Sequence, residues 1–422
     1  MITRKTPESL GSRGYIAEGK GFEPLVRGYR TMVFKTISFG RSDNPPTSLE
    51  FIACFRELCI RVNLVCMCAD RELKNPADEA TPTEMTPTEM TVVSFDGAGG
   101  PEVIRAGRGA VPVPGPGEVL IRVHACGVNP ADVSQREGNY RPPKGASDVP
   151  GLEVAGEVVG HGRGVNAAVW PLGERVVALI DAGGYAEYAV APVAQVLRVP
   201  RGISLVDAAA LIEVAATVYS NLVMTTRLQA GETVLVHGAS GGIGTFAVQW
   251  LAACGHTVYA TASTADKCQW ALDRGATEAI NYKDEDFVER IKQLTDGRGV
   301  DVVLDVVGGA YLDRNLRCLA TDGRMVTIGL VGGRKAELDM GRMMVRRLSV
   351  HGTTLRARPA DQKAVIVAAV GQHVWPLVAD GRVTVPVDAR FPLEQAKEAH
   401  EYLAQKEHYG KIVLTTLSGH RA

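Results

Sequence analysis

From residue 234 onward, short apolar runs alternate with longer segments whose apolar positions recur at helical spacing. The apolar runs are VLVH (234–237), HTVYATAS (256–263), TEAINY (277–282), VDVVLDVVG (300–308), GRMVTIGLVGG (323–333) and RLSVHGTTL (347–355). Strands and helices that alternate in this way are typical of right-handed crossovers and a doubly wound parallel sheet. We therefore predict an α/β domain over residues 216–355.

A glycine-rich turn follows the first of these runs. It reads G-A-S-G-G-I-G over residues 238–244 and leads into the apolar run TFAVQWLAACG. A strand, a glycine turn and a helix in this order bring a pyrophosphate onto the free N–H groups and the positive dipole end of the helix. The spacing is not the plain G-x-G-x-x-G, so a strand–turn–helix without a ligand stays the alternative. The predicted binding residues are Ala239, Gly241, Gly242, Ile243 and Gly244.

Residues 90–215 follow a different pattern, in which short alternating strands are punctuated by glycine and proline, as in GLEVAGEVVGHG and GERVVALIDAGGYAEYAVAP. This pattern is typical of a small antiparallel, barrel-like domain. The stretch 356–422 holds two helical segments and a closing strand, GKIVLTTL, and we assign it to the same domain. The active site is expected between the two domains, at the carboxyl ends of the parallel strands.

Residues 1–89 lack a sustained period and contain PESLGSRG, SDNPPTS and the direct repeat TPTEMTPTEM. We expect either a disordered extension or an over-extended reading frame, with the functional chain starting at Met85 or Met90. Four of the eight cysteines lie here, without a C-x-x-C pair or a second pair at zinc spacing, so no metal site is predicted from them. These four are Cys54, Cys59, Cys66 and Cys68.

Composition and charge narrow the classes of function. The 422 residues are enough for two or three domains of about 150 residues each. A net charge of −1 gives no reason to expect nucleic acid or an anionic membrane as a partner. No apolar run reaches the roughly 18 residues of a membrane span, and no apolar core of a secretory signal follows the first basic residues. We therefore predict a cytoplasmic protein with reduced thiols.

Eight motifs, in order over about residues 91–416, together resemble the zinc-independent quinone oxidoreductases of the medium-chain dehydrogenase/reductase superfamily. They are HACGVNPADVSQREGNY, GLEVAGEV, GERVVAL, GGYAEY, ASGGIGTFAVQ, GATEAINYKDEDF, DVVLDVVGG and GKIVL. The runs NYRPPKGASDVPGLEVAGEV and HEYLAQKEHYGKIVL are most similar to the tumour-suppressor-inducible branch, close to zeta-crystallin. The resemblance implies a GroES-like, β-rich catalytic domain built from both chain ends, with an inserted Rossmann domain. It also implies a homodimer that pairs Rossmann edge strands, here RLSVHGTTL.

Two positions distinguish this chain from the zinc alcohol dehydrogenases of that superfamily, which place a Cys and a His on the catalytic metal. The corresponding residues here are Asn129 and Leu152. Neither side chain can supply a thiolate or an imidazole, and the four-cysteine structural zinc lobe is absent from the sequence, so we predict no metal. A quinone or an activated alkene needs less help from a Lewis acid, because its conjugation accepts the hydride.

The end of the second strand bears on the choice of nicotinamide cofactor. An acidic residue there would bind the ribose 2′-OH and repel a 2′-phosphate. The sequence ATASTADK instead offers hydroxyls and Lys267, which suit a phosphate dianion and favour NADPH. The resemblance places Lys267 and Tyr282 on that phosphate beside Ser263, and Gly329 and Leu330 beside the nicotinamide. The alternatives are a solvent-exposed helix lysine for Lys267 and a packing aromatic for Tyr282.

Asn129, Tyr140 and Thr217 are the candidates at the reacting end. The resemblance places the first two in the quinone cleft and Thr217 near the nicotinamide carboxamide. Asn129 can donate an N–H to a quinone oxygen that gains charge, and Tyr140 can stack on the quinone or donate a proton. The alternatives are an Asn-Pro turn, an exposed loop aromatic and an ordinary helix threonine.

The sequence therefore predicts an NADPH-dependent, metal-free oxidoreductase that reduces a small-molecule quinone, with the cofactor carrying the chemistry. One alternative is a 2-alkenal or enoyl reductase of the same superfamily, which acts on an activated alkene. Another is a protein that binds NADPH without turnover.

Overall fold

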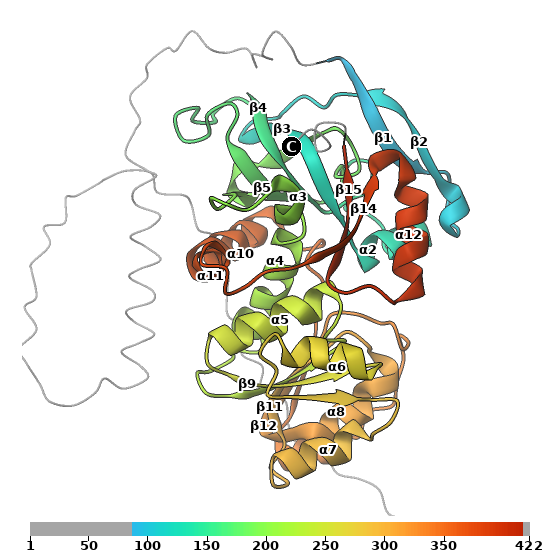
Figure 1. Cartoon of the computed structure of the whole chain (residues 1–422), viewed down its shortest axis with the longest axis vertical. Helices are drawn as coiled ribbons and strands as arrows, with labels where there is room; N and C mark the ends of the chain where they lie inside the picture. Colours follow the sequence, from blue (N-terminus) through green and yellow to red (C-terminus); the bar gives the residue numbers. More distant parts are fainter. Residues whose placement is uncertain (1–86, 417–422) are drawn as a thin grey trace, which may run out of the picture. The chain divides into compact units, whose positions relative to one another are not determined.

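The computed structural model describes residues 87–416, which form the two sheets and surrounding helices of Figure 1. The predicted extension, with its four cysteines, lies outside the described residues apart from residues 87–89. The first described strand, β1, begins at Glu89.

The inserted part of the chain forms a six-stranded parallel sheet in the order β10-β9-β8-β11-β12-β13. This order confirms the predicted doubly wound sheet, with β8 central and β13 at one edge. The strands are β8 Thr233–His237, β9 Thr257–Ala262, β10 Glu278–Asn281, β11 Val300–Asp305, β12 Leu319–Thr327 and β13 Ser349–Gly352. The helices between them are α5 Gly242–Ala253, α6 Ala265–Leu272, α7 Phe287–Leu294, α8 Leu312–Cys318 and α9 Met340–Arg346.

Three predicted strands run too far at their carboxyl ends. The apolar runs 300–308, 323–333 and 347–355 continue past the ends of β11, β12 and β13, and their last residues form loops. In β11 the reason is visible, because the carboxylate of Asp305 accepts the N–H groups of Val307 and Gly308. These bonds turn the chain out of the sheet at the edge where the glycine turn also lies.

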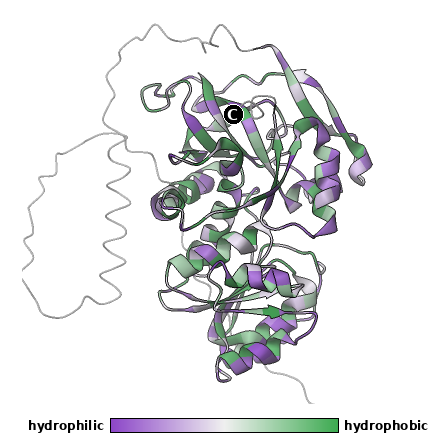
Figure 2. Cartoon of the chain, in the orientation of Figure 1, coloured by the Kyte–Doolittle hydropathy of each residue, from purple (hydrophilic) through white to green (hydrophobic). Residues whose placement is uncertain are grey.

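Helices cover both faces of the parallel sheet because successive strand residues point to opposite faces. Val234 and Val236 pack in the core cluster that contains α4 (Ile212–Tyr219) and α5. Leu235, between them, packs in the cluster that contains α7 and α8. Figure 2 shows the hydrophilic and hydrophobic stripes that the outer helices carry side by side, as expected for helices with one buried face.

The remainder of the described chain forms a seven-stranded sheet in the order β14-β15-β3-β4-β5-β7, with β6 also paired to β3. Its neighbours are antiparallel except for β14 and β15. Since β14 and β15 come from the C-terminal part, both ends of the chain build one sheet, as the resemblance implied. The strands are β3 Glu118–Val128, β4 Glu153–His161, β5 Arg175–Leu179, β6 Tyr188–Pro192, β7 Val196–Arg198, β14 Val387–Pro392 and β15 Lys411–Thr415.

A hairpin and several helices surround this sheet. The hairpin pairs β1 (Glu89–Phe95) with β2 (Ile104–Ala110). The helices are α2 Pro130–Arg136, α3 Leu205–Ala208, α10 Ala360–His373, α11 Trp375–Ala379 and α12 Ala396–Gln405. Helix α10 packs on α4, so the C-terminal part also contacts the segment that leads into the parallel sheet.

The structure corrects the expectation that no stretch of the chain is long and apolar enough to span a membrane. Within residues 87–416, Leu205–Thr225 is long and apolar enough by length and composition, with a mean hydropathy of 1.4. It contains α3, α4 and a π-helical turn over Ser220–Thr225, and 78% of its most apolar 18-residue window is buried inside the protein. Its apolar character is explained by its place in the core between the two sheets.

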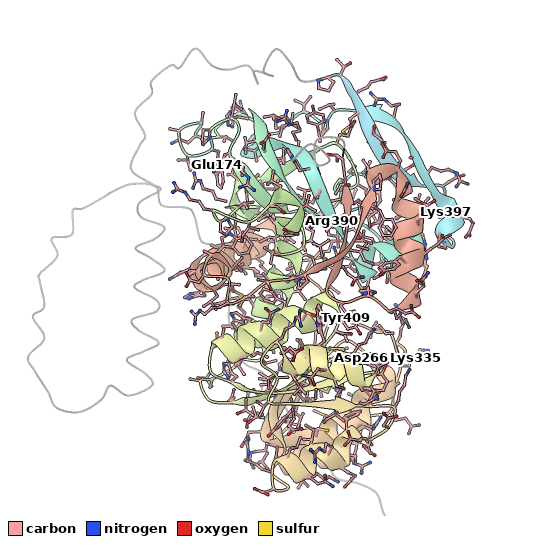
Figure 3. All side chains as sticks on the ribbon, in the orientation of Figure 1. Glu174, Asp266, Lys335, Arg390, Lys397 and Tyr409 are labelled. Carbon is pink, nitrogen blue, oxygen red and sulfur yellow. The ribbon has the colours of Figure 1, made fainter. Side chains whose placement is uncertain are left out.

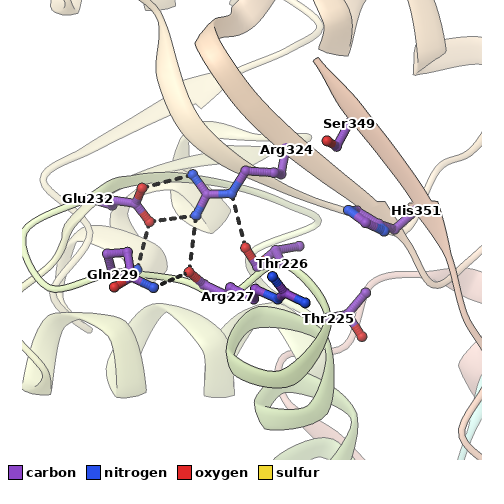
Figure 4. A pocket seen from close by; sticks show the side chains of 8 residues that line it. All are labelled: Thr225, Thr226, Arg227, Gln229, Glu232, Arg324, Ser349 and His351. Carbon is purple, nitrogen blue, oxygen red and sulfur yellow. Dashed lines mark hydrogen bonds and ion pairs between the residues drawn. The ribbon is translucent and has the colours of Figure 1, made fainter. Parts of the chain in front are cut away.

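A hollow of about 350 Å³ lies at the amino ends of β8 and β13 (Figure 4). Arg324 on β12 forms a two-pronged ion pair with Glu232, at 2.8 and 2.7 Å, and donates to the carbonyl of Thr226. These bonds tie the end of the linking helix to the start of the parallel sheet. The hollow is therefore at the opposite sheet edge from the glycine turn.

Candidate active site

The glycine turn joins β8 to α5 in tight contact with the helix that follows. A Cβ on Gly244 would lie 2.2 Å from the carbonyl oxygen of Gly238, so only glycine allows this packing. At Gly241, the residue before the helix, the nearest atom to a Cβ would be 3.7 Å away. The backbone of Gly241 is therefore bare on the side where a Cβ would point, while its N–H donates to Gly238 O.

This turn fits a pyrophosphate group. The N–H groups of Gly242, Ile243 and Gly244 belong to the first turn of α5 and have no acceptor within the helix. The dipole of the 12-residue helix adds positive potential at the same end. Ala239 is fully buried and donates its N–H to Thr261 O at 3.0 Å, so it shapes the turn from beneath.

The C-terminal part of the chain contacts the turn directly. Gly410 pairs with Gly241 in an isolated parallel bridge and donates its N–H to Ser240 O at 2.8 Å. The next residue, Lys411, runs along the start of α5, where a Cβ on Gly242 would lie 2.6 Å from its Cδ. The glycine turn and the catalytic sheet are thus joined through Gly410 and Lys411.

The ammonium group of Lys411 ends in a buried polar cluster. It donates to Glu153 Oε1 at 2.6 Å and to Asn129 Oδ1 at 2.5 Å. Asn129 Nδ2 donates to the same Glu153 oxygen at 3.0 Å, and only 3% of Asn129 is exposed. The amide of Asn129, which we expected to face a quinone, is therefore engaged with Glu153 and Lys411. Asn129 is also the N-cap residue of α2, which begins at Pro130.

Glu213 extends this cluster along α4. Its backbone N–H donates to Glu153 Oε2, and its own Oε1 accepts the hydroxyl of Thr217, each at 3.0 Å. Burial raises the pKa of Glu213 to about 7, and Glu153 acts in the same direction while Lys411 opposes it. Thr217, predicted near the nicotinamide carboxamide, thus lies one helical turn from a carboxyl group that titrates near neutral pH.

A second buried series of hydrogen bonds involves residues of α2. Arg136 can only donate, so neutral His400 accepts at Nδ1, at 3.2 Å, and donates from Nε2 to the Tyr185 hydroxyl. That hydroxyl donates to Asp132 Oδ2, which also accepts the N–H of Asn129. Burial raises the pKa of Asp132 to about 6 and lowers that of His400 to about 3. The series fixes α2 and therefore the position of Asn129.

Tyr140 follows α2 and is partly buried, so it is not the exposed loop aromatic of the alternative interpretation. The guanidinium of Arg356 lies over its ring, 5.6 Å from the ring centroid. Burial raises the pKa of Tyr140, and the charge of Arg356 and a hydrogen bond with Thr354 oppose that shift. The phenol is thus held beside a cation.

The residues predicted for a 2′-phosphate follow β9 and β10. Ser263 is partly exposed directly after β9, and Tyr282 is 37% exposed directly after β10. Asp266 lies exposed in α6 (Figure 3), beyond the end of the strand. No acidic residue occupies the end of β9, which leaves room for a phosphate dianion.

Lys267, the other residue predicted at the 2′-phosphate, lies on α6. It is only 8% exposed, so it is not a solvent-exposed helix lysine. Its ammonium group donates to Lys406 O at 2.6 Å and lies 5.5 Å from the ring centroid of Tyr409. Tyr409, labelled in Figure 3, packs on Trp270 of α6 with ring centroids 4.8 Å apart. Lys267 therefore joins α6 to the loop before β15.

Gly329 and Leu330 lie in the loop after β12. A Cβ on Gly329 would be 2.7 Å from Val306 O, so this loop approaches the one after β11 closely. Leu330 is 52% exposed. Both loops are at the carboxyl edge of the sheet, on the β11 side of the glycine turn.

Four charged residues of the site were missed from the sequence: Glu153, Glu213, Arg356 and Lys411. The signal that could have found three of them is a single charge inside an apolar run, as in GLEVAGEV, AALIEVAATVY and GKIVL. A charge in such a run is buried when the run is a core element, and a buried charge requires a partner. Arg356, in TTLRARP, carries no such signal.

Among residues 87–416, no group of three or more His, Cys, Asp or Glu side chains is placed to hold a metal ion. Leu152 is a buried apolar residue next to Glu153. Cys126 is 1% exposed, and burial raises the pKa of its thiol well above the ordinary value, as expected for a small buried residue. His237 is fully buried between Thr261 and Asn315 and is structural.

Two known families match separate parts of the described chain. Residues 115–201 match the alcohol dehydrogenase GroES-like domain, and residues 242–370 match the zinc-binding dehydrogenase family.

Whole relatives match over most of the chain. Quinone oxidoreductase of Homo sapiens is 33% identical over 307 residues, covering 72% of this chain and 90% of the relative. Quinone oxidoreductase 1 of Escherichia coli is 35% identical over 333 residues, covering 77% and 99%. The solved structure of Escherichia coli quinone oxidoreductase complexed with NADPH superposes with a TM-score of 0.69 at 34% identity, covering 77% of this chain and 99% of that one. The Pseudomonas syringae enzyme gives 0.71 at 30%, with the same coverage.

Proposed function

Since the chain belongs to the quinone oxidoreductases of the medium-chain dehydrogenase/reductase superfamily, we propose that it reduces quinones by hydride transfer and without zinc. It is an oxidoreductase, and NADPH is its cofactor, as in the related Escherichia coli and mycobacterial structures solved with NADPH. The observation that carries the proposal is the bare backbone of Gly241, joined through Lys411 to the polar cluster around Asn129.

The residues of this chain provide binding and orientation. The first turn of α5 would hold the pyrophosphate, and Ser263 and Tyr282, directly after β9 and β10, would bind the 2′-phosphate. NADPH supplies the hydride when it is bound. Lys411 and Glu153 fix Asn129 at the reacting end, and Glu213 holds the hydroxyl of Thr217. A rigid site of this kind aligns the acceptor with the nicotinamide.

The side chains at the reacting end support the zinc-independent mechanism. Leu152 has no donor atom, and the oxygen of Asn129 already accepts from Lys411. A Zn²⁺ ion would have to displace this ammonium group, and its approach would be opposed by the positive charge. The matched family is named for zinc binding, but the side chains at this site do not provide the set of donor atoms that zinc requires.

The experiment that tests the proposal follows NADPH oxidation by the purified full-length protein with 1,2-naphthoquinone, 1,4-benzoquinone and a 2-alkenal. We expect turnover of the quinones that is insensitive to EDTA. With NADH, kcat/KM should fall at least about tenfold, because each hydrogen bond to the 2′-phosphate dianion contributes about 1.5 kcal/mol or more.

Each other outcome contradicts one part of the proposal. Turnover of the alkenal alone would move the protein to the alkene reductases. Loss of activity with EDTA, restored by Zn²⁺, would overturn the metal-free mechanism. NADPH binding without oxidation by any of these acceptors would favour a binding protein.

We also propose a homodimer in which β13 pairs with β13 of a second copy. Among the described strands, β13 has a neighbour only on its β12 side. Apolar side chains are exposed beside it, with Met344 75%, Val345 79% and Val350 37% exposed. A contiguous apolar surface next to an unpaired strand edge is typical of an interface.

Light scattering after size exclusion tests this interface. We expect twice the mass of one chain for the wild type, and a monomer for Val345→Asp. The effect is large because a twofold axis places the substitution at the interface in both copies. Each buried valine contributes about 1.5–3 kcal/mol. The matched control is Val365→Asp on α10, which is 61% exposed and away from β13 and should stay dimeric. A wild-type monomer at micromolar concentration would contradict the proposal.

A further inference from the structure

Arg356 is a buried cation at the junction of the two sheets. It follows β13, where the chain leaves the parallel sheet for α10, and only 5% of it is exposed. Burial lowers the pKa of its guanidinium, while Asp132, Tyr140 and Asp181 oppose that shift. A buried guanidinium is costly unless its N–H groups have acceptors.

Two of its three nitrogens have such acceptors. Nε donates to the carbonyl of Asp181 at 2.6 Å, and Nη1 donates to Gln135 Oε1 at 2.7 Å. Gln135 lies on α2, and Asp181 follows β5, so both anchors belong to the catalytic part. The plane of the guanidinium is therefore fixed by two bonds.

The third nitrogen, Nη2, is buried and has no hydrogen-bond partner among residues 87–416. An unpaired donor on a buried charged group costs several kcal/mol of desolvation in general, and native proteins seldom keep one without a use. Lys363, the neighbouring buried cation, shows the contrast, because its ammonium group contacts both Asp181 and the carbonyl of Arg356.

The surroundings of Arg356 belong to the reacting end. The guanidinium lies 5.6 Å from the ring centroid of Tyr140, the aromatic residue predicted to contact the quinone. Tyr140 in turn interacts electrostatically with Glu213, the partner of Thr217. The guanidinium of Arg356 thus lies beside the aromatic residue assigned to the acceptor.

We propose that Nη2 of Arg356 binds the acceptor oxygen that becomes negatively charged during reduction. The proposal rests on the quinone reductase function proposed above. A hydride delivers two electrons and one hydrogen to the quinone and leaves one oxygen as a phenolate, while the nicotinamide is oxidised. One proton from water then completes the hydroquinone. A fixed, buried cation stabilises the phenolate more than the neutral carbonyl, so it lowers the barrier.

The test compares Arg356→Ala with Gln135→Ala, which removes the acceptor of Nη1 and keeps the guanidinium and its bond from Nε to the carbonyl of Asp181. We expect kcat with 1,2-naphthoquinone to fall about 30-fold in Arg356→Ala, as for loss of one hydrogen bond to a charged group. Gln135→Ala should lose less than about threefold. Guanidinium chloride at millimolar concentration should restore part of the lost kcat in Arg356→Ala, and it should not change Gln135→Ala.

A binding measurement gives a readout besides turnover. The visible absorbance of 4-nitrophenolate, which carries a phenolate oxygen and cannot accept a hydride at that oxygen, reports its binding to the protein with NADP⁺. We expect about tenfold weaker binding in Arg356→Ala and less than about threefold weaker binding in Gln135→Ala. The affinity for NADPH, measured by its fluorescence, should be unchanged in both.

The outcomes separate this inference from the proposed function. A wild type that reduces no quinone overturns the function. A wild type that reduces quinones, with unchanged kcat and 4-nitrophenolate binding in folded Arg356→Ala, overturns the role of Arg356. Equal losses in Arg356→Ala and Gln135→Ala without guanidinium rescue also overturn it, because they would show a structural anchor. Arg356→Lys, which keeps the charge, replaces Arg356→Ala if the latter does not fold.

Discussion

Replacement of Lys411 by methionine is expected to lower the free energy of unfolding by about 3–5 kcal/mol. Lys411 is 4% exposed and Glu153 is fully buried, with 2.6 Å between the ammonium nitrogen and Oε1. Methionine fills most of the volume of the lysine but leaves the carboxylate of Glu153 charged and unpaired. The remaining N–H donors, from Asn129 and Glu213, are neutral and cannot replace a charge. Urea unfolding measures the loss.

A second substitution separates the lost charge from lost packing. In Lys411→Met with Glu153→Gln, no charge remains at the pair, and the new amide can donate to the oxygen of Asn129 that Lys411 leaves. We expect at least half of the lost stability to return. Lys397→Met, on the exposed face of α12 (Figure 3), is the control and should change stability by less than about 0.5 kcal/mol. If Lys411→Met alone were as stable as wild type, the ion pair between Lys411 and Glu153 would not stabilise the fold.

Lys411 also shows why the sequence predicts the fold better than the site. The alternation of apolar runs and helical segments identifies the parallel sheet, because each run buries the residues that a central strand must bury. The same rule places GKIVL in the catalytic sheet, where β15 lies between β14 and β3. It does not say which atoms the lysine meets, because Asn129 and Glu153 are 282 and 258 positions away.

The glycine turn and the reacting end also differ in how well the sequence predicts them. The turn is a local structure, since the clash of a Cβ on Gly244 with Gly238 involves residues six positions apart, and the sequence predicts it. The reacting end combines α2, β4, α4, β15 and the loop after β13, so its contacts depend on how the two sheets pack. For this reason the sequence names Asn129 and Tyr140 as candidates, while it does not predict the contacts of Asn129 with Glu153 and Lys411 or the position of Arg356 beside Tyr140.

The second large effect concerns pH, and Glu213 is the residue that produces it. Burial, together with the charges of Glu153 and Asp132, raises its pKa from the ordinary 4.5 to about 7, and Lys411 opposes this shift. Between these two values the folded protein holds a proton that the unfolded chain has released. Stability contributed by this protonated state is therefore complete below about pH 4.5 and is lost as the pH rises through 7. A pKa difference of one between the folded and unfolded chain corresponds to about 1.4 kcal/mol, so the loss for this residue is roughly 3 kcal/mol.

Glu213→Gln removes the titration while keeping a group that can accept the hydroxyl of Thr217. We expect the free energy of unfolding of Glu213→Gln, relative to wild type, to rise by roughly 3 kcal/mol between pH 5 and pH 8. Urea unfolding at several pH values measures the difference. Glu394→Gln, at an exposed position before α12, should follow the wild-type curve at every pH. A difference between Glu213→Gln and wild type that does not change with pH would mean that the carboxyl group is ionised throughout this range. Lys411 would then compensate fully for burial, and Glu213 could not hold a proton beside Thr217 at neutral pH.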